Sequence, residues 1–130
     1  MKMEEITANV SWLAVVTGAI AAFLIGWLWY SPRLFGTKWA EGVGVKLSDS
    51  DEMPMGAMQA QAIGLLLMSW FVSVTAANNA LLTVILATFA FTMLAYGGGM
   101  FAKHSSYARS VNAGYWIVSM VVMVIANGIF

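Results

Sequence analysis

Four long apolar runs, separated by polar segments, make up most of the chain. They cover residues 9–30, 57–77, 81–101 and 111–130, and none of them contains Asp, Glu, Lys or Arg. Each run is long enough to cross a hydrocarbon core of about 30 Å as a helix that rises about 1.5 Å per residue. The pattern therefore predicts an all-α fold, an integral membrane bundle of four transmembrane helices.

The first polar segment begins directly after the first apolar run. Pro32 disfavours the helical conformation of the residue before it, so the first helix is expected to end there. Leu34, Phe35 and Trp39 then recur at helical spacing beside two basic residues. This amphipathic pattern predicts a short helix over residues 33–39 that lies in the membrane interface.

The other polar segments predict how the spans connect. Residues 41–55 form a hydrophilic loop, and the asparagine pair at 78–79 predicts a tight turn that joins the second and third spans as an antiparallel hairpin. A short polar loop at 103–110 precedes the fourth span.

The distribution of lysine and arginine predicts the orientation, because basic loops stay in the cytoplasm. The first and third loops together carry five of these residues: Arg33, Lys38, Lys46, Lys103 and Arg109. The opposite side carries only Lys2. We expect a multi-pass protein of the bacterial cytoplasmic (inner) membrane with both termini outside.

Composition agrees with one membrane domain. Of the 130 residues, 61% are hydrophobic and 9% are charged, whereas about a quarter of the residues in a soluble domain are charged. The spans use most of the chain, so residues 1–130 are expected to form a single transmembrane domain whose partner is the lipid bilayer. The net charge is zero, and the absence of a basic stripe excludes a nucleic-acid partner. The lack of cysteine excludes disulfides and Cys-ligated zinc.

Neutral polar side chains inside three of the spans form a candidate polar path. On the third and fourth helices their spacing places each set along one helix face. The residues of this path are Ser69, Ser73, Thr88, Thr92, Asn112, Ser119 and Asn127. Interhelical hydrogen bonds that fix packing, worth about 1 kcal/mol or less each, explain such faces too, and we favour this explanation.

Small residues spaced by four form a ridge on the first helix. Gly18, Ala22 and Gly26 allow another helix backbone to approach closely, which predicts close packing and a homo-oligomer formed through this ridge. Three consecutive glycines at 97–99 indicate either close packing or a local break near the end of the third helix, and we favour packing.

Neither a metal centre nor a catalytic centre is predicted. His104 is the one histidine, and no serine or carboxylate stands at a recognisable catalytic spacing from it. Met53, Met55 and Met58 together with His104 are a candidate Cu(I) ligand set, but flexible apolar residues at a helix start explain the methionines better. We therefore expect no enzymatic activity, no cofactor and no metal.

The segment Trp-Tyr-Ser-Pro at residues 29–32, followed by Phe-Gly at 35–36 and by Trp39, resembles the domain of unknown function 1761 family of small bacterial and fungal membrane proteins. Asn112 and Tyr115 match a second feature of that family, an Asn and a Tyr at the start of the last helix. The resemblance covers essentially the whole chain and implies four spans. It implies no activity, so no functional residue follows from it.

The favoured function is that of a non-enzymatic interaction or membrane-organising protein. Contacts with lipid headgroups or with a partner are assigned to residues at the first loop: Trp29, Tyr30, Arg33, Phe35, Lys38 and Trp39. The alternative is a small transporter or channel for a neutral or weakly charged solute, which would use the neutral polar faces.

Overall fold

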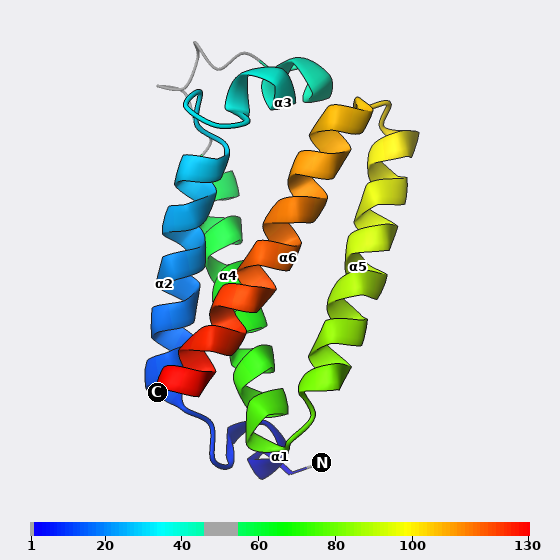
Figure 1. Ribbon diagram of the computed structural model, residues 1–130. Helices are drawn as coiled ribbons and strands as arrows, with labels where there is room; N and C mark the ends of the chain where they lie inside the picture. The colour runs from blue at the N-terminus through cyan, green and yellow to red at the C-terminus, as the bar shows by residue number, and fades with distance from the viewer. Residues whose placement is uncertain (1, 46–54) are drawn as a thin grey trace.

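The computed structural model describes residues 2–45 and 55–130, and within them every regular element is a helix. The helices are α1 (Glu4–Thr7), α2 (Trp12–Trp29), α3 (Gly36–Val43), α4 (Met55–Ala77), α5 (Leu81–Phe101) and α6 (Ser106–Ile129). Of these, α2, α4, α5 and α6 are long and apolar enough to cross a membrane. Figure 1 shows α3 across one end of this bundle and both chain termini at the other end. The predicted all-α bundle of four membrane helices is confirmed.

The outward face of the bundle is apolar. On α5, Leu82 is 81% exposed and Phe101 is 93% exposed, and large aliphatic side chains on the other long helices also point outward. A soluble protein with such a surface would be prone to aggregate, whereas lipid chains cover it in a bilayer. The fold is therefore that of a multi-pass membrane protein.

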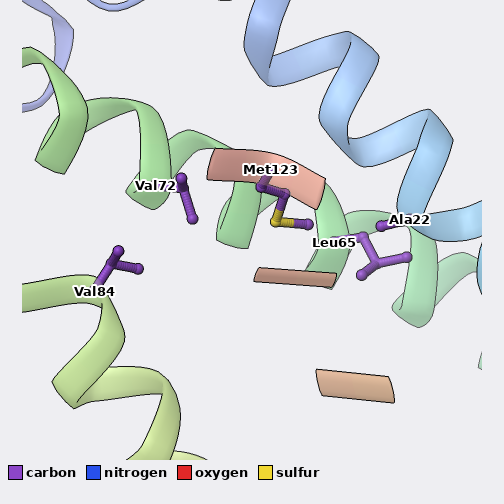
Figure 2. Close-up of a cluster of buried hydrophobic side chains, with 5 residues drawn as sticks. All are labelled: Ala22, Leu65, Val72, Val84 and Met123. Carbon is purple, nitrogen blue, oxygen red and sulfur yellow. The ribbon is translucent and has the colours of Figure 1, made fainter. Parts of the chain in front are cut away.

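A core of small and medium-sized side chains joins the four long helices. It consists of Ala22 from α2, Leu65 and Val72 from α4, Val84 from α5 and Met123 from α6. Figure 2 shows Met123 between Val72 on one side and Leu65 and Ala22 on the other. Helix α2 packs against both α4 and α6, whereas α5 packs chiefly on α6. In Figure 1, α4 and α5 meet at their shared turn and diverge toward the α3 end.

The turn between α4 and α5 lies where it was predicted. Helix α4 ends at Ala77 and α5 begins at Leu81. Between them Asn79 has a φ of 54°, a left-handed conformation that asparagine tolerates better than most residues. The α5 helix then runs unbroken through the three glycines at 97–99, so the local break is not present.

Three of the membrane helices begin at residues other than those predicted. Helix α4 begins at Met55, two residues before the predicted span. Helix α2 begins at Trp12, whereas the predicted span began at residue 9. Helix α6 begins at Ser106 and not at residue 111, because the Ser105 hydroxyl accepts a hydrogen bond from the Ala108 N–H at 3.0 Å and caps the helix. Arg109 therefore lies on a helix and not in a loop.

The short helix α3 also begins later than the predicted helix over 33–39. The Gly36 N–H donates to the Ser31 carbonyl at 2.9 Å, which folds the chain into a compact turn before the helix starts. A Cβ on Gly36 would collide with the Tyr30 carbonyl oxygen, so this turn requires glycine. Hydrophobic spacing does not report such backbone contacts, and the predicted start was wrong for that reason.

The N-terminal tail contains a short helix, α1, that was not predicted. The Trp70 Nε1–H donates to the Ile6 carbonyl of α1 at 2.7 Å. Trp70 also packs against Trp12, with 5.4 Å between the ring centroids. These two indoles attach the tail to the end of the bundle remote from α3.

The small-residue ridge of α2 packs inside the same chain. A Cβ on Gly18 would lie 2.9 Å from the Ser69 hydroxyl oxygen, and a Cβ on Gly26 would lie 2.6 Å from the Tyr115 hydroxyl oxygen. Ala22, between the two glycines, is fully buried. The ridge therefore brings α2 close to α4 and α6. Self-association through it stays a prediction, and it would have to compete with these contacts.

Candidate functional site

Asn112 of α6 is the centre of a joint between α2, α3 and α6. Its Oδ1 accepts a hydrogen bond from the Tyr30 hydroxyl at 2.6 Å and a second from the Trp39 Nε1–H at 3.0 Å. The indole N–H is only a donor, so the amide oxygen must face it, and two donors fill the two lone pairs of that oxygen. Next to this pair, the Trp29 Nε1–H donates to the Val111 carbonyl at 3.0 Å.

Aromatic contacts surround this joint. Tyr30 packs edge-on against Trp39 at 4.9 Å and against Tyr115 at 5.5 Å between ring centroids. The Tyr115 hydroxyl donates to the Ala22 carbonyl at 2.7 Å, and it fits there because Gly26 carries no side chain. The end of α2, helix α3 and the start of α6 are thus fixed to one another by both hydrogen bonds and ring packing.

A cavity of about 420 Å³ lies beside the joint, within the size range of small-molecule sites. It is lined by residues of α4, α5 and α6 together with Tyr30 and Trp39. Its polar and aromatic lining residues include Gln61, Thr92, Tyr96, His104, Arg109, Asn112 and Trp116. Gln61 of α4 and Ala95 and Gly98 of α5 are exposed, so the opening of the cavity lies between α4 and α5. We call it the polar cavity.

Arg109 is the one charged residue among the described residues that line the polar cavity. Its Nε–H lies 3.2 Å from the His104 carbonyl and 3.3 Å from the Ser105 carbonyl. Its guanidinium carbon lies 4.7 Å from the centre of the Tyr96 ring, a cation–π contact. A Cβ on Gly99 would lie 2.8 Å from Arg109 Cγ, so this glycine makes room for the arginine stem. The arginine is held in place by these groups.

The donor set of the polar cavity suits an anion better than a metal cation. Its described lining has one imidazole and no carboxylate. Nor do three His, Asp or Glu side chains come together anywhere in residues 2–45 and 55–130. Met53, a member of the candidate Cu(I) set, lies outside the described residues, so the structure does not assess that set.

A second cavity, of about 520 Å³, lies between α2 and α4. Apolar side chains form most of its lining: Phe23, Trp27, Pro32, Met58 and Leu65. Tyr115 of α6 also lines it. Tyr30 and Gln61 line both this cavity and the polar cavity, so the two are neighbours. We call it the apolar cavity.

The residues assigned to headgroup contact separate into two groups. Trp29, Tyr30 and Trp39 direct their polar atoms to α6, as described above, and Phe35 packs on Trp29 with 4.9 Å between ring centroids. Arg33 and Lys38 are exposed. The Lys38 ammonium lies 5.5 Å from the centre of the Tyr107 ring. Headgroup contact stays a prediction, and Arg33 and Lys38 are the exposed cations of the set.

The structure brings only two residues of the candidate polar path, Thr92 and Asn112, to the polar cavity. Ser69 and Ser73 instead bond to α2 or to the residue before it: Ser69 donates to the Val15 carbonyl at 2.7 Å, and Ser73 accepts from the Ser11 N–H at 3.2 Å.

The other three residues of the path lie away from the cavity lining. Asn127 bonds within its own helix, to the Met123 carbonyl at 2.9 Å. Thr88 and Ser119 are buried. The hydroxyls of Thr92 and Ser119 have no hydrogen-bond partner among the described residues.

Sequence reasoning missed two of the side chains that give the polar cavity its chemistry, Arg109 and Gln61. Arg109 contributed only to the predicted orientation in the membrane, because residues 103–110 were predicted to form a loop. The signal that pointed here was the glycine triplet, since Gly99 is the residue on which the Arg109 stem lies.

The chain matches the family described as "Protein of unknown function (DUF1761)" over residues 13–128. This match covers most of the sequence, so the chain belongs to that family, as the resemblance predicted. Comparisons with curated proteins and with solved structures give no match. In space, the two stretches that carried the resemblance meet, because Tyr30 and Trp39 of the first bond to Asn112 of the second.

Proposed function

We propose that this member of the DUF1761 family is a membrane-embedded binding protein that takes up a small anionic molecule in the polar cavity. One observation carries the proposal: the Arg109 guanidinium lies at a cavity of about 420 Å³ that no described carboxylate lines. The activity is non-enzymatic, and it is closer to the transport alternative than to membrane organisation.

The geometry of Arg109 supports an anion as ligand. Within the described part of the chain, its hydrogen bonds all start from Nε, which leaves the two terminal nitrogens to bind a carboxylate or phosphate in a bidentate manner. The Asn112 amide nitrogen is a further donor, because the amide oxygen is saturated by Tyr30 and Trp39. Such donors stabilise an anion more strongly at a site partly shielded from water than in bulk solvent.

The charge distribution supports an orientation in which the α3 end of the bundle, where Arg109 lies, faces the cytoplasm. Arg33, Lys38, Lys103 and Arg109 all lie at the α3 end of the bundle, whereas Lys2 lies at the end with the termini. By the positive-inside rule the α3 end faces the cytoplasm, which supports the proposal that both termini are outside. A bacterial inner membrane fits this orientation.

A second proposal concerns the outer surface at the same end. Trp27, near the end of α2, is 72% exposed, and Arg33, Leu34 and Lys38, which follow it in the chain, are also exposed. An apolar and basic surface of this kind suits anionic headgroups at the membrane interface. This surface supports the interaction role, which is compatible with ligand binding inside the bundle.

The main proposal is tested by measuring ligand binding to the protein reconstituted in nanodiscs of zwitterionic phosphatidylcholine. Benzoate and inorganic phosphate are the anionic probes, and neutral benzamide is the control for benzoate. We expect at least one anion to raise the unfolding temperature saturably, since a ligand at ten times its Kd stabilises the folded state by about 1.4 kcal/mol. Benzamide should have no such effect.

Two substitutions locate the effect. Arg109→Gln should abolish the stabilisation by the anion, whereas Arg109→Lys, which keeps the charge, should retain part of it. Lys103→Gln removes an exposed charge that does not line the polar cavity, and it should bind like the unsubstituted protein. No stabilisation by either anion, or equal stabilisation of the Arg109→Gln variant, would refute the proposed function.

A further inference from the structure

The polar and apolar cavities share two lining residues, and only one of these is held in place by a hydrogen bond. Both cavities are lined by Tyr30 and Gln61. Tyr30 is held by its hydrogen bond to Asn112 at 2.6 Å. Gln61 is exposed, and its side chain makes no hydrogen bond to any other described residue. Gln61 is therefore the shared lining residue that can change rotamer without disturbing the joint at Asn112.

The lining residues of the two cavities differ in chemistry on the two sides of Gln61. On one side of Gln61 are Arg109 and the Asn112 amide, which bind an anionic group. On the other side are Phe23, Met58 and Leu65, which favour an apolar group. A molecule that occupies both cavities therefore needs a negative charge at one end and a hydrocarbon segment at the other.

The position of the apolar cavity gives such a molecule access from the bilayer. The cavity lies between α2 and α4, and its lining residue Trp27 is 72% exposed on the lipid-facing surface. A hydrocarbon chain would enter between these helices while its head group reaches Arg109 past Gln61.

We propose that the two cavities together form one site for a single-chain amphiphile with an anionic head group. The inference rests on the proposed function and names its ligand class. The polar cavity takes the carboxylate or phosphate head, and the apolar cavity, a single compartment of about 520 Å³, takes one hydrocarbon chain. A fatty acid and a lysophospholipid share this chemistry, whereas a two-chain phospholipid does not.

Equilibrium binding of radiolabelled decanoate to protein in phosphatidylcholine nanodiscs tests the inference, with the amount bound by protein-free nanodiscs subtracted. We expect saturable binding of about one decanoate per protein. Met58→Trp fills the apolar cavity and should weaken decanoate binding at least tenfold while leaving binding of the short anion unchanged. Ile63→Trp places the same side chain on the exposed face of α4 and should change neither.

The outcomes separate the two proposals. If benzoate or phosphate binds but decanoate does not, or if Met58→Trp binds decanoate as tightly as Ile63→Trp, the amphiphile site is wrong and the anion site stands. If neither a short anion nor decanoate binds, both are wrong. Retained binding of the short anion shows that the Met58→Trp variant is folded; Phe23→Trp serves in its place if this variant does not fold.

The source of the amphiphile is tested by competition. Decyl phosphate should displace decanoate, since both present an anionic head on one chain. Phosphatidylglycerol added to the nanodisc bilayer should leave decanoate binding unchanged. Displacement by phosphatidylglycerol would mean that a two-chain anionic lipid of the bilayer occupies the site, which would overturn the single-chain assignment.

Discussion

Replacing Asn112 with leucine is the most direct test of the joint that holds α3 to the bundle. Leucine has nearly the same size but no acceptor, so the Tyr30 hydroxyl and the Trp39 indole N–H both lose their partner. Side-chain hydrogen bonds in membrane proteins contribute about 0.6 kcal/mol on average and up to about 1.7 kcal/mol. Two bonds of 2.6 and 3.0 Å therefore predict a loss of about 1 to 3 kcal/mol in the free energy of unfolding.

The measurement is reversible unfolding in mixed micelles with a denaturing detergent, followed by tryptophan fluorescence and circular dichroism. Asn127→Leu is the matched control, because the Asn127 amide donates only within its own helix, to the Met123 carbonyl at 2.9 Å. This control should lose less than about 0.5 kcal/mol. A double-mutant cycle with Trp39→Phe isolates one of the two bonds and should give a coupling free energy of about 0.6 to 1.7 kcal/mol.

Equal stability of the Asn112→Leu and Asn127→Leu variants would refute this account of the joint. So would strict additivity in the cycle with Trp39→Phe, because additivity means that the indole and the amide do not interact.

Two further predictions concern the turn before α3 and the orientation. Gly36→Ala should destabilise the protein by about 1 to 3 kcal/mol in the same unfolding assay, because the added Cβ collides with the Tyr30 carbonyl. The control is Gly64→Ala, whose Cβ meets nothing within 4 Å. Its free energy of unfolding should stay within about 0.5 kcal/mol of that of the unsubstituted protein. The chain has no cysteine, so single cysteines can be introduced and labelled with an impermeant thiol reagent in intact cells. A cysteine at Ser106 should not react, and a cysteine at Asn78 should react. The reverse labelling pattern would show that the proposed topology is inverted.

Most of the fold is predictable because one property of the sequence, hydropathy, decides it. A membrane helix needs an uninterrupted apolar run, and the chain has four such runs with no charged residue. The same property fails at helix ends, because hydropathy reports which residues contact lipid and not which residues are helical. Ser105 caps α6 in a polar stretch, so the predicted loop at 103–110 is largely the first turn of that helix.

The candidate site was predictable only in part, because its contacts join residues far apart in the sequence. The aromatic residues at 29–39 stood out, but an amphipathic ring fits a lipid headgroup and an internal acceptor equally well. The structure shows the internal acceptor of Tyr30 and Trp39, which is Asn112, more than 70 positions away. No spacing rule connects residues at that separation.

One face of α6 contributes both to the stability of the bundle and to the proposed binding site. Arg109, Asn112, Ala113 and Trp116 recur at helical spacing and all line the polar cavity. On this face Asn112 has two tasks, since its oxygen holds the end of α2 and helix α3 while its nitrogen remains a donor for a ligand. A ligand that bonds to this amide would also restrain the joint, so ligand binding and the position of α3 are linked through a single side chain.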